Sequence, residues 1–580
     1  MGKAKEQNFL QGALILGMAT VIVKVIGVFF KIPLTNLLGG TGMAYFFTAY
    51  DLFNPLYTLA MAGFPVAVSK IVSENYAKWR FRDVRKVLRL SMFLFLATGI
   101  IGTAAMAVGA RAFAYGVNNP KAFLPVLVMA PAIFFGCLMS AFRGYYQGLR
   151  NMYPTAVSQV VEAIAKLVFG IAFAYSIMGK GLEEFAVSGT VFGQIAANLE
   201  AAKELLLPFG AAGAVAGVTL STAVGCIFLI LRHKLIGDGI VSEQLQASPQ
   251  PVSSKKLFIT LASIAFPIVL SSVVGHMTTL IDLGSIMNRL ETAINADTPA
   301  FLRMYQGILP EAMKLSEIPV FLYGSYTGLA VSVFNLVPAV STTIGVSALP
   351  AVASAWAVRN RSGVKRSIEG VLRVTCFMVL PAGLGISALA KPILNLLFSA
   401  RPIEVAIAAP ALEIMGIGSI LVAITTPVNS MLQAVGKITL PVKLMLIGCA
   451  IKLATNYVLV SQPEINIQGA PYGTILCYGF IVIASLIALV RSSGVDLDYM
   501  GVFIKPLFAA GICAMSAKLS FSLLSAISDS GLWTILAIAI GGIFYLFTLF
   551  LTKTIKKDDI LMLPGGEKMA NILEKHFVLR

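Results

Sequence analysis

Long apolar segments separated by short polar loops make up almost the whole chain. Most of them reach the roughly 20 residues that an α-helix needs to cross a bilayer. The pattern predicts an all-α polytopic membrane protein with about fourteen transmembrane helices, at 10–35, 43–72, 88–110, 123–148, 153–178, 208–231, 257–283, 317–357, 366–389, 405–433, 438–460, 468–491, 501–527 and 532–552. The eighth is too long for one straight helix, and Pro338 and Pro350 predict a bend in it.

Composition agrees with a membrane protein and argues against a soluble one. Hydrophobic residues make up 57% of the 580 residues and charged residues only 12%, whereas soluble domains carry roughly 25% charged residues. The net charge of +17 is explained by Lys and Arg retained on the inner face of a membrane protein. We therefore expect the lipid bilayer, and no nucleic acid, as a partner.

The basic residues gather in alternate loops. If the N-terminus is inside, the cytoplasmic segments include 70–89, 143–150, 232–256, 359–373 and the tail from Lys553, and they hold most of the 44 Lys and Arg. Both termini are then cytoplasmic. Within this topology, Ser242–Ser254 is expected to be a flexible cytoplasmic linker, and the external stretch 180–203 an interfacial helix.

Two halves of the chain resemble each other. Phe53-Asn54 and the later VLRLSMF recur as Phe334-Asn335 and VLRVTCF, and the pairs Gln147/Gln433 and Lys166/Lys452 share one spacing. A duplication predicts two six-helix lobes, 1–235 and 257–492, related by a pseudo-twofold axis along the membrane normal. Residues 236–256 form the linker between them, and 493–580 add two extra helices and a basic cytoplasmic tail.

Charged residues inside the apolar segments are the candidates for function. A charge at the centre of a membrane helix costs at least ~2.5–3.5 kcal/mol of insertion free energy. A water-filled cavity is therefore expected beside Lys24 and Lys31, which share one helix face. Asp51 lies at a depth that Lys31 could reach. Excess positive charge of this kind suits a phosphate-bearing substrate. The candidate substrate-binding residues are Lys24, Lys31, Asp51, Asn54, Glu162, Lys166 and Lys452.

A purely structural interpretation of these charges stays open. Glu162 and Lys166 are one helical turn apart and could form a salt bridge, as could Lys31 and Asp51. Asn54-Pro55 could make its helix mobile or only kinked. The six cysteines lie in apolar segments without metal-binding spacing, and the common nucleotide, zinc and nucleophile motifs are absent. We expect no metal, no cofactor and no enzymatic activity.

Three stretches resemble a known family. They are the opening 65 or so residues, which include KVIGVFFK at Lys24–Lys31, then KPILNLLF at Lys391–Phe398, and NIQGAPYGT at Asn466–Thr474. The chain resembles the bacterial polysaccharide exporters related to stage V sporulation protein B and the MurJ-type lipid II flippases. This resemblance implies the fold of the multidrug/oligosaccharidyl-lipid/polysaccharide exporter superfamily, with a groove for a lipid tail at 501–552. The resemblance also implies that Lys24 and Lys31 lie close to the positions of two essential basic residues in the first helix of MurJ-type flippases.

The chain departs from the Gram-negative members of that family in two places. No arginine follows Asn54, and the eighth helix has no basic residue within its span. We infer that Lys166 and Lys452 supply the missing charge.

The resemblance implies a flippase for an undecaprenyl-pyrophosphate-linked saccharide, such as lipid II or a related cell-wall precursor. It would act as a monomer in the bacterial plasma membrane, by alternating access with ion or membrane-potential coupling, in sporulation or in vegetative growth. A cation-coupled multidrug antiporter of the same superfamily and a membrane-embedded saccharide polymerase or ligase are the alternatives.

Overall fold

The computed structural model describes residues 9–61, 64–310, 313–528, 530–552 and 554. Internal contacts divide the chain into two compact units, residues 1–288 and 289–580, and each unit is described by itself. The duplication and the domain boundaries expected from the sequence stay predictions. The basic tail expected from Lys553 onward falls almost entirely outside the described residues.

Membrane-spanning helices dominate both units. Among the described residues, twelve helical segments are long and apolar enough to cross a bilayer. The first, Ile15–Ala77, contains two of the predicted helices, and the predicted helix 257–283 lies within a further long helix, α9. The prediction of an all-α polytopic membrane protein is confirmed.

Unit 1 begins with a bent helix and continues through long helices with short connections. Its elements are α1 (Phe9–Met61), α2 (Phe64–Ala77), α3 (Phe81–Gly116), η1 (Pro120–Ala122), α4 (Phe123–Met129), α5 (Pro131–Gly148), α6 (Tyr153–Ser188), β1 (Thr190–Val191), β2 (Gln194–Ile195), α7 (Leu199–Ile236), α8 (Ser242–Ala247) and α9 (Ser254–Ala296), which continues past residue 288. The expected interfacial helix at 180–203 is wrong, because an antiparallel two-stranded hairpin joins α6 to α7 there.

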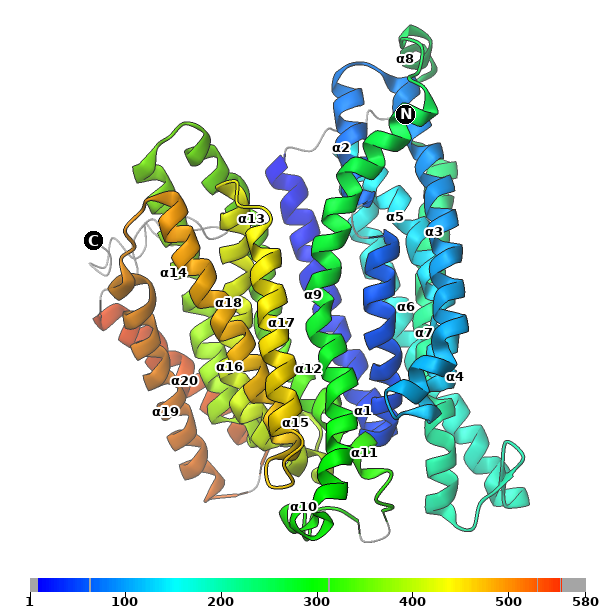
Figure 1. Cartoon of the computed structure of the whole chain (residues 1–580), viewed down its shortest axis with the longest axis vertical. Helices are drawn as coiled ribbons and strands as arrows, with labels where there is room; N and C mark the ends of the chain where they lie inside the picture. Colours follow the sequence, from blue (N-terminus) through cyan, green and yellow to red (C-terminus); the bar gives the residue numbers. More distant parts are fainter. Residues whose placement is uncertain (1–8, 62–63, 311–312, 529, 553, 555–580) are drawn as a thin grey trace. The chain divides into compact units, whose positions relative to one another are not determined.

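A single glycine folds α1 back on itself. Gly39 has φ 62° and ψ −171°, a conformation that residues with a Cβ rarely adopt. The helix is therefore interrupted there, and α1 has a first arm before Gly39 and a second arm after it. Figure 1 shows the two arms, in blue, running in opposite directions from their meeting point. This turn brings residues near Lys31 opposite residues near Tyr50.

Glycines also allow α6 and α7 to pack closely along their lengths. A Cβ on Gly217 of α7 would collide with the backbone of Gly170 of α6. A Cβ on Gly213 would lie 3.1 Å from the carbonyl oxygen of Phe173. The two helices therefore approach to backbone contact, an arrangement typical of small residues at helix interfaces in membranes.

Unit 2 contains the remaining helices. They are α10 (Thr298–Met304), α11 (Ile318–Ser325), η2 (Tyr326–Ala330), α12 (Val331–Phe334), α13 (Leu336–Ala357), α14 (Arg361–Ala388), α15 (Ala390–Leu397), α16 (Pro402–Ala434), α17 (Leu440–Leu459), η3 (Asn466–Gln468), α18 (Gly469–Ser493), η4 (Met500–Ile504), α19 (Lys505–Ser525) and α20 (Leu532–Leu551).

The predicted eighth helix is interrupted at two places. Residues 326–330 form a π-helical turn, in which one extra residue is inserted into the α-helical ladder. The hydroxyl of Ser332 donates to the carbonyl of Thr327, five residues back, at 3.3 Å. The second interruption is at Asn335, between α12 and α13 and one turn before Pro338, where a proline disturbs the preceding turn. Pro350 lies inside α13.

The connection between α7 and α9 is bound to the start of α3. The Nε of Arg82 donates to the carbonyl of Leu245 at 2.9 Å, and Lys86 donates to the carbonyl of Val252 at 2.6 Å. The fully buried carboxylate of Asp83 accepts from the backbone N–H of Val252 at 2.7 Å. The sequence predicts a flexible linker here, whereas the structure shows a docked segment that includes the short helix α8.

Asp238, in the same connection, binds residues of α3 and α5. Arg85 binds it through two nitrogens at 2.9 and 3.0 Å, and the Tyr145 hydroxyl donates to it at 2.9 Å. Burial raises the pKa of Asp238, but hydrogen bonds from Arg85, from the N–H of Ile240 and from Tyr145 outweigh burial, so the net pKa is lowered. This stabilisation is therefore complete at neutral pH and is lost only as the pH falls through that lowered pKa.

Unit 2 has a comparable contact after its own α18. The side chain of Glu369 in α14 accepts from the backbone N–H of Asp498 at 2.9 Å. In both units, a charged residue near the start of a long helix thus binds the segment that leaves a later helix.

The linker contacts predict a change in protease sensitivity. Asp238→Asn removes the charge that Arg85 binds, and charge-assisted hydrogen bonds are worth about twice neutral ones. We expect a Glu-specific protease to cleave the purified protein after Glu243 several-fold faster in this variant. Asp496→Asn changes an exposed aspartate in unit 2 and serves as the matched control. Equal cleavage rates in wild type and Asp238→Asn would show that the linker is not held by this contact.

Candidate functional site

A group of charged residues lies where the two arms of α1 meet α6 and α5 in unit 1. We call it the cationic cluster and define it as Lys24, Lys31, Asp51, Arg143, Glu162 and Lys166. Lys31 is half-buried, and its Nζ lies 5.2 Å from the centre of the Phe47 ring. It also lies within electrostatic range of Lys166, Lys24 and Asp51. Four of the predicted site residues are thus brought together.

Lys166 is held between aromatic rings. Its Nζ lies 4.9 Å from the ring centres of both Phe30, in the first arm of α1, and Tyr50, in the second arm. Ring faces attract cations, and the attraction strengthens when both groups leave water. One turn further along α6, Gly170 leaves room for Phe30, because a Cβ there would lie 2.6 Å from that ring. Lys166 therefore links α6 to both arms of α1.

Glu162 bonds to a residue that the sequence analysis did not select. Its carboxylate accepts from Nη2 of Arg143 in α5 at 2.9 Å, while Nε of Arg143 donates to the hydroxyl of Ser158 at 2.9 Å. The suggested Glu162–Lys166 salt bridge is therefore wrong, since Lys166 faces aromatic rings instead. Arg143 was missed because it lies near the end of its helix, where a basic residue is expected at the membrane surface.

Aromatic residues line the second arm of α1 beside the cluster. Ring centres are 4.8 Å apart for Phe46 and Tyr50, 6.2 Å for Tyr50 and Phe53, and 5.0 Å for Phe53 and Tyr57. Spacings of three and four residues place all four on one face of the helix. The hydroxyl of Tyr50 is buried and makes no hydrogen bond within the described residues. The aromatic face thus carries a polar group, beside Lys166, that could bind a further polar partner.

The other predicted residues of unit 1 differ in exposure. Lys24 is exposed on the first arm of α1, Asn54 is half-buried, and Asp51 is only 7% exposed. Lys24 therefore presents an accessible ammonium group, whereas Asp51 is covered by protein. Counting Arg143, the cluster has four basic and two acidic side chains, a formal excess of positive charge.

Lys452, predicted to be the duplicate of Lys166, lies in unit 2. It is 3% exposed in α17, and its Cγ lies close to the space beside Gly473 of α18. Asn456, one turn later, approaches the same glycine. These contacts belong to the α17–α18 interface of unit 2.

The described residues contain no group of three or more His, Cys, Asp or Glu positioned to hold a metal ion. All six cysteines are buried. The cluster therefore offers binding and electrostatic chemistry, based on ammonium, guanidinium and aromatic groups.

Comparison with known proteins identifies relatives over the full length. Residues 9–202 match the family model of polysaccharide biosynthesis proteins, and residues 325–458 match the MatE model. The chain is 25% identical to lipid II flippase MurJ of Bacillus subtilis over 97% of its own length and 98% of the relative. It is 22% identical to stage V sporulation protein B of the same organism over 96% and 98% of the two chains. The predicted resemblance is confirmed.

Solved structures agree on the fold. The structure of lipid II flippase MurJ in an inward closed conformation matches with a TM-score of 0.61 at 12% identity, over 93% of this chain and 98% of that one. The chain therefore has the multi-helix fold of MurJ. It is a multi-pass membrane protein homologous to lipid II flippase MurJ and to stage V sporulation protein B.

The Arg143–Glu162 contact predicts coupled stability effects. Arg143→Gln and Glu162→Gln each leave a half-buried charge without its partner. The double variant should therefore lose less unfolding free energy than the sum of the losses in the two single variants. We expect a coupling of about 1–2 kcal/mol, read from thermal unfolding of the detergent-solubilised protein.

The control is a second double-mutant cycle, made of Lys166→Gln and Glu162→Gln. The coupling free energy between these two changes should be smaller. If the stability losses of Arg143→Gln and Glu162→Gln are additive in the double variant, the ion pair does not hold α5 to α6.

Proposed function

We propose that this protein is a flippase that moves an undecaprenyl-pyrophosphate-linked saccharide, such as lipid II or a related precursor, across the plasma membrane by alternating access. The single observation that carries the proposal is the cationic cluster on α1 and α6 of a chain homologous to MurJ over its whole length. It would act as a transporter rather than as an enzyme, as a monomer, with both termini cytoplasmic.

The charge of the cluster is the argument for an anionic substrate. A lysine is a compact point charge that binds phosphate oxygens. Lys24 is exposed and Lys31 is seven residues away on the same helix face, so both could approach one pyrophosphate. Lys166, fixed between Phe30 and Tyr50, adds positive potential behind them.

The acidic residues have supporting roles in this proposal. Glu162 is occupied by Arg143, which leaves the positive charge of Lys166 uncancelled by a direct ion pair. Asp51 lies near Lys31 and would hold its ammonium in place, while Asn54 could donate to saccharide or phosphate oxygens. Lys452 would supply positive charge from unit 2.

Membrane potential offers a driving force. A charge that crosses the whole potential gains ~2.3 kcal/mol per 100 mV. With the inside negative, the potential would favour return of an empty cationic site toward the cytoplasm. Ion coupling is the other possible source of energy.

A cation-coupled multidrug antiporter is the second candidate, favoured by the MatE match at residues 325–458. Such a protein needs available carboxylates for sodium or protons and for a cationic drug. Within the cationic cluster, one carboxylate is bonded to Arg143 and the other is 7% exposed. The net positive charge of the cationic cluster therefore favours the flippase.

Replacing Lys24 tests the proposed substrate contact. Lys24→Ala should abolish complementation of a flippase-depleted bacterial strain while leaving the membrane level of the protein normal, because an accessible substrate-binding charge is lost without loss of packing. Lys24→Arg, which keeps the charge, should retain part of the growth.

Lys180→Ala removes an exposed lysine near the outer end of α6 and should complement fully. Normal growth of a strain that carries only Lys24→Ala would remove Lys24 from the substrate site.

Reconstitution separates the two candidate functions. Proteoliposomes with purified protein should move a fluorescent undecaprenyl-pyrophosphate-linked saccharide between leaflets, and should not accumulate a cationic dye under a sodium or proton gradient. Dye accumulation that depends on the gradient, without movement of the lipid-linked saccharide, would favour the antiporter.

A further inference from the structure

An apolar groove lies where α6 begins and α7 ends, away from the cationic cluster. The groove is open to the surface and has a volume of about 360 Å³. Its walls include Tyr153 and Val157 of α6 and Leu231, Leu235 and Ile236 of α7. All five are exposed residues. In a water-soluble protein such a surface would be unusual, but lipid chains can cover it in a membrane protein.

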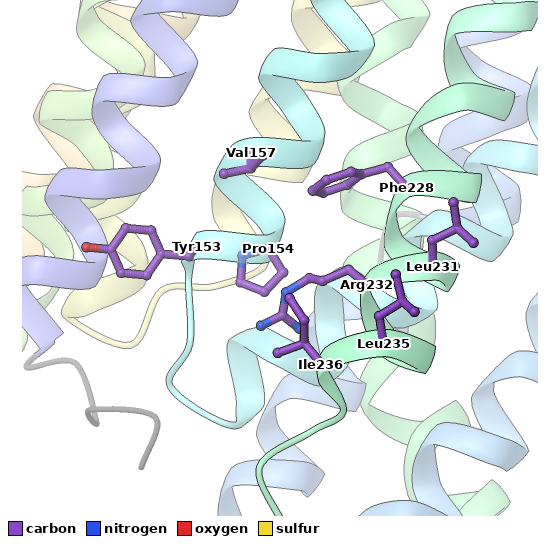
Figure 2. Close-up of a pocket in the computed structure, with 8 residues that line it drawn as sticks. All are labelled: Tyr153, Pro154, Val157, Phe228, Leu231, Arg232, Leu235 and Ile236. Atoms are coloured by element: carbon purple, nitrogen blue, oxygen red, sulfur yellow. The ribbon is translucent and has the colours of Figure 1, made fainter. Parts of the chain in front are cut away.

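One charged side chain lies in this otherwise apolar groove. Figure 2 shows the guanidinium group of Arg232 between Pro154 and Ile236. Its Cζ lies 4.3 Å from the ring centre of Tyr146, and its Nη1 is buried without a hydrogen-bond partner among the described residues. A buried donor left without an acceptor costs free energy, so an anion placed here would be stabilised.

The position of Arg232 is fixed by its neighbours. The hydroxyl of Tyr146 hydrogen-bonds to Nδ1 of His233 at 2.8 Å and donates to the carbonyl of Gly237 at 3.2 Å, so the ring under the guanidinium is held. The nearby carboxylate of Asp238 is bound by Arg85 and Tyr145. The ring under Arg232 is therefore fixed in place, and the carboxylate of Asp238 is already engaged by other residues.

The groove lies at the ends of two candidate membrane-spanning helices. α6 and α7 are both candidate membrane-spanning helices, and the groove is at the first turns of one and the last turns of the other. Exposed Arg150 and Lys234 flank these helix ends. Basic pockets between helices at a membrane surface bind anionic lipid headgroups.

We propose that this groove is a binding site for an anionic glycerophospholipid, with the phosphate on Arg232 and an acyl chain along the apolar walls. The apolar walls distinguish this ligand from free phosphate, which would gain nothing from Leu231 or Leu235. The site is separate from the proposed transport function, and the lipid would brace the α6–α7 pair at the membrane surface.

Native mass spectrometry of the full-length protein tests the site, with phosphatidylglycerol and phosphatidylcholine as probes. Wild type should retain phosphatidylglycerol at lower lipid concentration than phosphatidylcholine. Arg232→Gln should weaken phosphatidylglycerol binding about fivefold, which is the effect expected from one basic residue, and should weaken binding of phosphatidylcholine, whose phosphate is balanced by its own choline, by less. Lys234→Gln, an equal charge change at an exposed neighbour outside the groove walls, should alter binding less.

Val157→Trp fills the groove without changing its charge, and should weaken phosphatidylglycerol binding even if Arg232→Gln fails to fold. Inorganic phosphate at millimolar concentration should not displace the lipid. Equal retention of the two lipids by wild type, or unchanged phosphatidylglycerol binding in both groove variants, would overturn the proposal, as would displacement by phosphate alone.

Discussion

The arrangement of unit 1 depends on one constraint, the cost of burying lysine ammonium groups within membrane-spanning helices. A lysine surrounded by lipid is costly, so each must find water, a counter-charge or an aromatic face. Lys166 lies between Phe30 and Tyr50, and Lys31 lies over Phe47. For Lys166, the two rings reduce the cost of burial without cancelling the charge, whereas a directly bonded carboxylate would cancel it. The cluster therefore keeps a positive potential that can act on a substrate.

Several features far apart in the sequence are needed to build this arrangement. The positive φ of Gly39 turns α1 so that its two arms face each other, and Gly170 admits Phe30 beside Lys166. The Arg143–Glu162 ion pair connects α5 to α6 and occupies the carboxylate that could otherwise neutralise Lys166. Backbone conformation, small residues and one ion pair together determine the electrostatics of the cluster.

Much of the fold could be predicted from the sequence, because a bilayer imposes a length and an apolar composition on each helix. Lys24, Lys31 and Lys166 could also be selected from the sequence, because a charged residue within an apolar membrane segment is costly. The partner of Glu162 could not be predicted, since helical spacing suggested Lys166 and gave no information on contacts between helices. The docked linker was also missed, because side-chain bonds to backbone carbonyls, such as Lys86 to Val252, leave no sequence pattern. The π-helical turn before Pro338 has no such signal either.

Homology to MurJ and the positive sign of the cluster lead to the same central claim, that lysines of the first helix bind the pyrophosphate of a lipid-linked precursor. The most direct test is a structure of the protein bound to an undecaprenyl-pyrophosphate-linked saccharide. The account predicts pyrophosphate density within roughly 4 Å of the ammonium groups of Lys24 and Lys31, the usual range of an ion pair. Precursor density elsewhere, with both lysines directed at lipid chains, would contradict it.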